Sequence, residues 1–129
     1  MRCADVMSTD VAIVHGEDEV GVANRIMQKR DIPFLPVCDA TGRVIGFVTH
    51  RHIAYVAITD DVGPSTPVKD VMGRDVFTCS PEDDVSVAER ALLEHPWQCA
   101  VCVGPNGEPV GIVGITDLAL AGRAPGRPP

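Results

Sequence analysis

The chain has 129 residues, of which 45% are hydrophobic and 22% are charged, and its formal charge is -7 at pH 7. These values are typical of a globular protein that forms one compact unit or two small halves sharing a core. The acidic balance and the scarcity of aromatic residues argue against nucleic-acid binding, which needs a basic face and bases stacked on rings. No apolar run approaches the roughly 18 residues of a membrane span, and no charged-then-apolar leader opens the sequence. We therefore expect a cytoplasmic protein with no nucleic-acid or membrane partner.

The sequence is duplicated with an offset of 65 positions. Aligned without gaps, residues 5–54 match the later copy at fifteen positions, where the composition alone would give about four. The duplication predicts two similar halves in a pseudo-twofold arrangement. The predicted divisions are repeat 1 at residues 1–58, a linker at 59–67, repeat 2 at 68–121 and a disordered tail at 122–129.

Each repeat predicts a short lead segment and then the order strand, helix, strand, strand, helix, which is an α+β fold. The lead segments and first strands are expected at residues 4–7 and 11–14, then at 68–72 and 76–79. Apolar residues spaced by three and four define the buried faces of the first helices. These faces are Val20, Ala23, Ile26 and Met27, then Val85, Ala88, Ala91 and Leu92.

Capping signals place the start of the first helix in repeat 2. Ser80 has the character of an N-cap, Pro81 stands at the first helical position and Asp83 lies three residues after the cap. The corresponding signal in repeat 1 is weaker, because Gly16 replaces the proline. We expect the two helices to end before Pro33 and Pro96.

Two pairs of apolar strands follow these helices, and turn residues separate the members of each pair. The pairs, expected as antiparallel hairpins, are residues 35–38 with 44–49 and residues 99–103 with 110–114. A final helix is expected to begin near Thr49 and near Thr116. Each helix start would leave backbone N–H groups unpaired beside polar residues, with an apolar strand behind. Such a junction suits a nucleotide better than a free anion.

The duplicated pattern resembles a pair of cystathionine-beta-synthase (CBS) domains, the arrangement called a Bateman module. The resemblance depends on the Asp-Val-Met runs at 5–7 and 70–72, on residues 78–83 and 32–37, and on the two junctions. It implies two packed three-stranded sheets with helices outside and two symmetric clefts between the repeats. It also implies binding of adenine nucleotides in those clefts, pairing into flat dimers, and a regulatory rather than catalytic role.

In such modules a Gly-apolar-apolar-Thr/Ser-x-x-Asp run supplies the polar end of the site. The resemblance implies that the Asp accepts hydrogen bonds from ribose and that the hydroxyl residue contacts phosphate. Repeat 1 keeps Thr49 but has His52 at the Asp position, whereas repeat 2 keeps Asp117 but has Gly114 at the hydroxyl position. A neutral imidazole offers one acceptor where a carboxylate offers two oxygens. At Gly114 the backbone N–H remains and Thr116 can substitute, so we rank the Asp117 site above the Thr49 site.

Other positions join the predicted ligand-binding set through the same resemblance. Ile13 and Thr78 occupy matching places where the family meets the base, and Pro36 and Val37 belong to the stretch that carries the resemblance. The alternative for Asp117 and Thr49 is plain helix capping, which stabilises a helix by about 1 kcal/mol without any ligand.

The run from His50 through Arg51 to His52 offers cationic donors at a helix start, where a cation opposes the dipole and a bound phosphate would offset it. Its alternative is a solvated helix end. As a metal site the run is poor, because it has two candidate ligands where structural zinc has four. We expect no metal and no cofactor other than a regulatory nucleotide.

The five cysteines, an odd number, are interpreted as free thiols in a reducing compartment, mostly buried. Cys99 and Cys102 have the spacing of a redox pair but fall in a predicted strand, where residues three apart face opposite sides. We therefore expect both to be structural. No catalytic constellation is evident, so we do not expect an enzyme.

The sequence leaves two main functions open, and a third, a thiol enzyme that uses Cys99 and Cys102, is disfavoured by their position in a predicted strand. The first is a regulatory module that binds an AMP-, ADP- or ATP-like adenosine compound and acts on a protein partner. The second is an interaction module of the same fold whose sites have lost their ligand. In either case a homodimer is predicted, with Tyr55, Val56, Ile58 and Leu118 covered in the interface.

Overall fold

The computed structural model describes residues 1–96 and 98–122. The chain divides into two compact units. The central unit is Ala12–Val76, and the terminal unit combines Met1–Val11 with the described part of residues 77–129. Each unit contains a three-stranded sheet and helices, which confirms the predicted α+β fold with two repeats. Of the predicted disordered tail, all but Gly122 lies outside the described residues.

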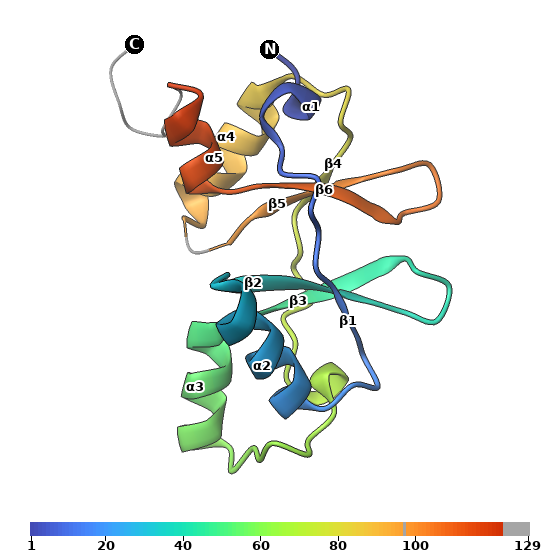
Figure 1. The fold of residues 1–129 in the computed structure, drawn as a ribbon, viewed down its shortest axis with the longest axis vertical. Coiled ribbons are helices and arrows are strands. Elements are labelled where there is room, and N and C mark those ends of the chain that lie inside the picture. Colours follow the sequence, from blue (N-terminus) through green and yellow to red (C-terminus); the bar gives the residue numbers. More distant parts are fainter. Residues whose placement is uncertain (97, 123–129) are drawn as a thin grey trace. The chain divides into compact units, whose positions relative to one another are not determined.

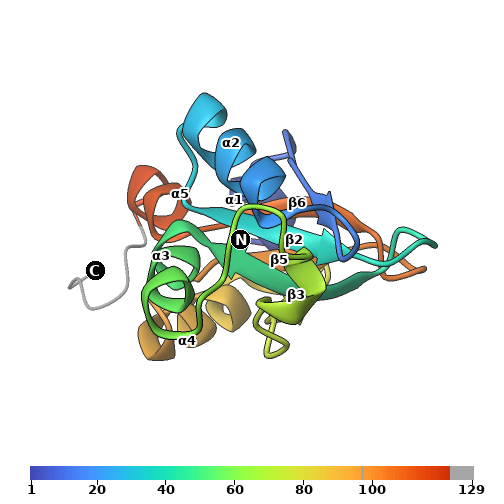
Figure 2. The same cartoon turned by 90° about the horizontal axis from the view of Figure 1, so that it is seen from below.

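The central unit contains a sheet of order β1-β2-β3, in which β1 is parallel and β3 antiparallel to β2. In two perpendicular views, α2 and α3 lie on the same face of this sheet (Figure 1, Figure 2). The elements are β1 (Val14–His15), α2 (Val20–Arg30), β2 (Phe34–Cys38), β3 (Val44–Thr49), α3 (His50–Thr59) and the 3-10 helix η1 (Val68–Asp70).

The terminal unit repeats this topology with sheet order β4-β5-β6, again parallel and then antiparallel. Its three helices lie on one face of the sheet (Figure 1). The elements are α1 (Cys3–Val6), β4 (Thr78–Cys79), α4 (Val85–Glu94), β5 (Ala100–Val103), β6 (Pro109–Val113) and α5 (Ile115–Leu120).

The hairpins agree with the sequence predictions, and so do the buried helix faces, except at Ile26 and Ala91, which are only partly buried. The strand pairs β2-β3 and β5-β6 are antiparallel, with bounds within one residue of those expected. On α2 the residues Val20, Ala23 and Met27 are buried, and on α4 the buried residues are Val85, Ala88 and Leu92. These residues belong to two separate apolar cores, one in each unit. Apolar periodicity therefore identified the main core contributors correctly.

The predicted first strands were too long, because only two residues of each pair with the next strand. Val14 and His15 pair with β2, and Thr78 and Cys79 pair with β5. Ile13 consequently precedes its strand.

The predicted helix start at Ser80 was wrong. α4 begins at Val85, and its N-cap is Asp84, whose carboxylate accepts a hydrogen bond from the Ser86 N–H. Residues 80–83 instead form a turn in which the Asp83 carboxylate accepts from the Ser80 N–H at 2.8 Å. The Ser-Pro-x-Asp pattern also suits such a turn, because its short polar side chains bond to nearby backbone groups. These residues therefore form the turn that precedes α4 and are not part of the helix.

The lead segments pack against the opposite repeat, so the compact units differ from the sequence repeats. In the terminal unit the Cys3 N–H donates to the Asp83 carbonyl, and the Ala4 N–H donates to the Pro81 carbonyl. In the central unit the equivalent bonds join Val68 to Asp18 and Lys69 to Gly16. Each unit is thus completed by a segment that belongs, by sequence, to the other copy.

A methionine in each lead segment explains why glycine occupies two equivalent positions, Gly46 and Gly111. A Cβ at Gly46 would meet the Met72 sulfur at 2.8 Å and the Gly73 carbonyl oxygen at 2.6 Å. A Cβ at Gly111, the equivalent position, would collide with Met7. Glycine therefore lets the lead segment lie directly on the last strand of its unit.

The helices within residues 1–96 and 98–122 are short. None of them combines the length and the apolarity that a crossing requires.

Candidate functional site

The central junction, Thr49–His52, joins β3 to α3. Thr49 is buried and caps α3, since its hydroxyl accepts a hydrogen bond from the His52 N–H at 3.0 Å. The imidazole of His52 lies 2.8 Å from the Val71 carbonyl oxygen through Nε2, so this nitrogen carries the proton and Nδ1 is left as the acceptor. His52 therefore holds the chain that follows η1, and only one ring nitrogen can face a ligand.

The terminal junction, Gly114–Asp117, joins β6 to α5. The Asp117 carboxylate accepts a hydrogen bond from the Gly114 N–H at 2.7 Å, which is the capping role foreseen as the alternative to ligand binding. Asp117 is half-buried, and its other oxygen accepts no hydrogen bond recorded from the described part of the chain. One carboxylate oxygen is thus fixed in place while the other remains open.

The Gly114 N–H is not free for a phosphate, contrary to the expectation from the sequence. Its hydrogen bond to Asp117 uses this donor, because the carboxylate three residues on reaches back to it. The glycine itself has a packing reason. A Cβ at Gly114 would approach the Cys99 sulfur to 3.2 Å, so the thiol fills the space that a side chain would take.

The remaining predicted ligand residues differ in exposure. His50, Arg51, Thr116 and Thr78 are exposed and Ile13 is partly buried. Pro36 and Val37 are fully buried, and Val37 belongs to the apolar core of the central unit. The side chains of Pro36 and Val37 are therefore inaccessible to a ligand in this structure.

Two grooves lie on the central unit. One, of about 440 Å³, includes Ile13 with Ile26 and Lys29, and the other, of about 460 Å³, includes His50 with Ile32 and Pro33. Both volumes are within the range of small-molecule sites. Ile13 lines the first of these two grooves and His50 lines the second.

The dimer residues proposed from sequence divide into two groups. Tyr55 and Ile58 on α3 are exposed, at 64% and 86%. Val56 and Leu118 are buried in the cores of their own units, so their inclusion in the interface was wrong. The reason is that α3 and α5 each pack one apolar face against their own sheet. Some of their apolar residues are therefore already buried without a dimer.

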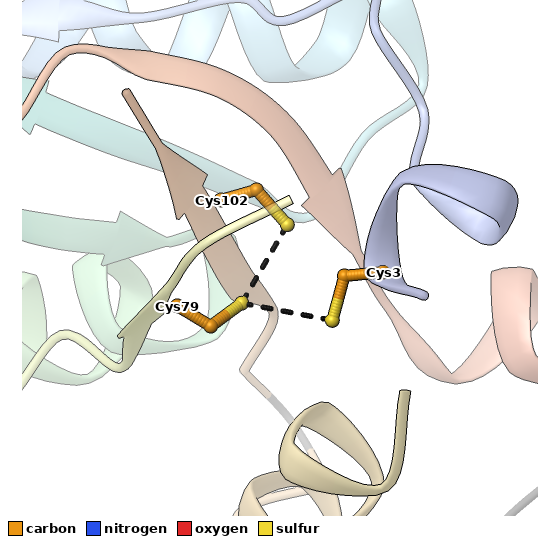
Figure 3. Close-up of side chains that lie close together, drawn as sticks. All are labelled: Cys3, Cys79 and Cys102. Carbon is orange, nitrogen blue, oxygen red and sulfur yellow. Dashed lines mark hydrogen bonds between the residues drawn. The ribbon is translucent and has the colours of Figure 1, made fainter. Parts of the chain in front are cut away.

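All five cysteines are free, and four of them are buried. Cys99 precedes β5 and is partly buried, and burial together with the Asp117 charge raises the pKa of its thiol to about 12. Cys102 lies in β5 with Cys79 and Cys3 around it (Figure 3). Cys99 is not part of this cluster, which supports the interpretation that Cys99 and Cys102 are not a redox pair.

The cluster of Cys3, Cys79 and Cys102 was missed by the sequence analysis. Its members come from α1, β4 and β5, and their sulfur atoms lie within 4.8 Å of one another. The Cys79 sulfur is 4.0 Å from that of Cys3 and 3.5 Å from that of Cys102. No local spacing signals this cluster. Only the duplication could have indicated it, by aligning three cysteines with three core positions of the other copy.

The fold and the two junctions define a duplicated α+β module with a polar strand-to-helix junction in each unit. Residues 3–58 and 68–123 each match the family model of the CBS domain. The chain therefore belongs to the CBS domain family.

Two relatives show how the module occurs elsewhere. The chain is 28% identical over 120 residues to an uncharacterized 17.7 kDa protein of Acidianus ambivalens, covering 93% of this chain and 72% of the relative. It is 33% identical over 128 residues to inosine-5'-monophosphate dehydrogenase of Methanocaldococcus jannaschii, covering 96% of this chain. The match spans only 24% of the dehydrogenase.

Two solved structures share the fold. The CBS domain pair of protein MJ0100, in complex with 5'-methylthioadenosine and S-adenosyl-L-methionine, has a TM-score of 0.83 at 21% identity, covering 94% of this chain and 98% of its own. CBSX2 in complex with AMP has a TM-score of 0.81 at 20% identity, covering 94% and 95%. At these identities the likeness concerns the fold alone.

Proposed function

We propose that the chain is a regulatory module that binds an adenosine-containing small molecule, with Asp117 as the ribose acceptor. The carboxylate of Asp117 carries the proposal, because it is held at the end of β6 by the Gly114 N–H and leaves one oxygen open. The bound adenosine compounds of MJ0100 and CBSX2, proteins of the same fold, support this ligand class. The role is regulatory rather than catalytic, and the signal passes to a protein partner.

A thermal-shift screen tests whether an adenosine compound binds at all. The ligands are AMP, ADP, ATP, NAD and S-adenosylmethionine, with guanosine and inosine nucleotides as controls. A ligand present at 100 times its dissociation constant stabilises the folded chain by about 2.7 kcal/mol. At least one adenosine compound should raise the melting temperature, and the guanosine controls should not. Failure of every adenosine compound would remove the proposal.

Substitution of Asp117 tests the site. Hydrogen bonds to charged groups contribute about 1.5–3 kcal/mol each, so Asp117→Ala should weaken binding about a hundredfold or more. Asp117→Asn keeps an oxygen for the Gly114 N–H but loses the charge and one acceptor. Binding by calorimetry should fall in both variants, whereas a purely capping role would spare Asp117→Asn.

His52 provides the matched variant in the other repeat. His52→Ala should leave ligand affinity nearly unchanged, because Nε2 of the ring is already hydrogen-bonded to the Val71 carbonyl oxygen. His52→Asp restores the family pattern beside Thr49 and should add a second bound ligand per chain. If His52→Ala abolishes binding while Asp117→Ala does not, the two sites are ranked the wrong way round.

The alternative is a CBS-fold interaction module without a ligand. The bond from His52 to Val71, the occupied Gly114 N–H and the buried Pro36 and Val37 favour this alternative. It predicts no stabilisation by any compound in the screen. The screen therefore decides between the two functions.

A homodimer is part of the proposal. Tyr55 and Ile58 leave a large apolar surface exposed on α3, which pairing would cover. Light scattering at micromolar concentration should give twice the mass of the chain, and Ile58→Glu should lower it. A monomeric mass for the parent chain would contradict this assembly.

A further inference from the structure

The cysteine cluster, defined as Cys3, Cys79 and Cys102, occupies positions at which this fold does not require a cysteine. Its equivalents in the central unit, 65 positions away, are Val68, Val14 and Val37. All three valines are at most 1% exposed and belong to one apolar core.

The backbone hydrogen bonds around the two sets of three residues correspond, although Cys3 begins an α-helix and Val68 begins a 3-10 helix. Cys79 pairs with Cys102 across β4 and β5, as Val14 pairs with Val37 across β1 and β2. The Cys3 N–H donates to the Asp83 carbonyl at 2.8 Å, and the Val68 N–H donates to the Asp18 carbonyl at the same distance. Valine therefore satisfies these positions, and packing alone does not account for three cysteines that meet.

The spacing of the sulfur atoms suits a metal ion. Three thiolates bonded to one ion at about 2.3 Å lie about 3.8–4.0 Å from one another. The Cys79 sulfur is 3.5 and 4.0 Å from its two neighbours, and all three sulfurs lie within 4.8 Å (Figure 3). Small side-chain rotations would bring them to bonding geometry.

The ligand set selects the kind of ion. All three donors are sulfur, and within the described part of the chain no histidine, carboxylate or fourth cysteine joins them. Cys3 and Cys102 are 0% exposed and Cys79 is 6% exposed, so water has little access to a fourth position. Structural zinc is four-coordinate, whereas soft thiolates also select copper(I).

We propose that Cys3, Cys79 and Cys102 form a three-coordinate thiolate site for a soft monovalent ion of the copper(I) class. This site is separate from the junction at Asp117 and does not depend on the proposed nucleotide. The ion would enter the site when the lead segment, residues 1–7, opens. This segment contributes Cys3 through a four-residue helix, which is too short to be stable by itself. It attaches to residues 81–85 by backbone hydrogen bonds and by the exposed ion pairs of the N-terminus with Asp84 and of Arg2 with Glu82.

Binding would also replace protons. Burial raises the pKa of the Cys3 thiol to about 12, and the pKa of Cys79 is raised by its hydrogen bond to Cys102 and by burial. Metal ligands of this kind are thiolates, so each thiol that becomes a ligand releases its proton.

The test uses reduced chain without oxygen and copper(I) supplied as its complex with a chromogenic chelator. The chain should take one copper per molecule from the chelator, show three sulfur ligands by X-ray absorption, and melt at a higher temperature with copper bound. Zinc(II) at the same concentration should not displace the copper. Failure to compete with the chelator, or tighter binding of zinc, would overturn the assignment.

Valine variants supply the controls, because the central unit shows that valine fits these positions. The triple variant Cys3→Val, Cys79→Val, Cys102→Val should fold and lose at least 90% of the copper bound by the parent. Cys38→Val, which removes a buried thiol of the central unit, should bind as the parent does. Copper retained by the triple variant, or lost equally in Cys38→Val, would contradict the site.

A transplanted site makes the test independent of any damage caused by the triple variant. Placing Val14→Cys, Val37→Cys and Val68→Cys in the triple variant should restore one copper per chain. No uptake by this chain, with its fold intact by circular dichroism, would show that the three positions do not form a copper site.

Discussion

The central and terminal units share their sheet topology and the backbone hydrogen bonds of their lead segments, although most aligned side chains differ, and two of these differences concern function. Where the terminal unit has Asp117, the central unit has His52, which is bonded to Val71. Where the terminal unit has three thiols, the central unit has three valines. Because the fold is common to the two, these differences are the places to look for a specific function.

The exchange of lead segments shows the opposite behaviour. The bonds from Cys3 and Ala4 to the turn at 81–83 recur between Val68, Lys69 and the turn at 16–18, although the side chains differ. These bonds belong to the backbone, so they tolerate sequence change. The side chains at such positions can therefore change and take a new role without loss of the fold. Cys3 of the cysteine cluster is at one of these positions.

The largest expected effect tests whether the two cores are packed alike. Leu35 is fully buried in the central unit, and Ala100 is its equivalent in the terminal unit. Leu35→Ala makes the two positions identical and should lower the free energy of unfolding by about 2–5 kcal/mol, because it leaves a cavity. Urea denaturation measures the loss. Leu93→Ala, at a residue 59% exposed, is the control and should change stability by less than about 0.5 kcal/mol. A loss below about 1 kcal/mol for Leu35→Ala would mean that the central core collapses to fill the space.

A smaller effect is expected at the two turns before the long helices. The Asp18 carboxylate accepts from the His15 N–H, and the Asp83 carboxylate accepts from the Ser80 N–H, each at 2.8 Å. Asp18→Ala and Asp83→Ala should each cost about 0.5–2 kcal/mol, as the loss of a cap does. Asn at either position should recover part of the loss. Costs that differ by more than about 1.5 kcal/mol would show that the turns are not equivalent.

The smallest effect at neutral pH concerns the thiols. Burial raises the pKa of Cys3 from 9.0 to about 12 and also raises the pKa of Cys38. Between pH 9 and 12 the unfolded chain loses the Cys3 thiol proton while the folded chain keeps it, so the free energy of unfolding falls as pH rises. Below pH 8 the thiols should contribute no pH dependence.

The triple valine variant tests which unit contains the thiols that cause the loss of stability at alkaline pH. It removes Cys3, Cys79 and Cys102, and it should therefore reduce the alkaline loss of stability more than Cys38→Val does. Guanidinium denaturation at pH 7.5 and in steps up to pH 11 provides the measurement. Equal slopes for the parent chain and the triple variant would show that the cluster thiols ionise in the folded chain.

The sequence alone determined the features that depend on neighbours along the chain. The repeat of 65 residues, the two hairpins and the apolar faces of α2 and α4 follow from periodicity and turn residues. The cap at Thr49 was also foreseen, since a hydroxyl before an apolar helix is a local signal. Ser80 was misassigned because its local pattern is shared by a helix start and by a turn.

The tertiary structure decided what depends on distant parts of the chain. Residues 81–85 bond to a lead segment almost eighty residues earlier, and His52 meets Val71 only because the chain after η1 returns to α3. Cys3, Cys79 and Cys102 belong to three elements with no common spacing, so their meeting follows from strand pairing and from the docking of α1. Local propensity carries no information about such contacts, because folding brings the segments together through long loops of the chain.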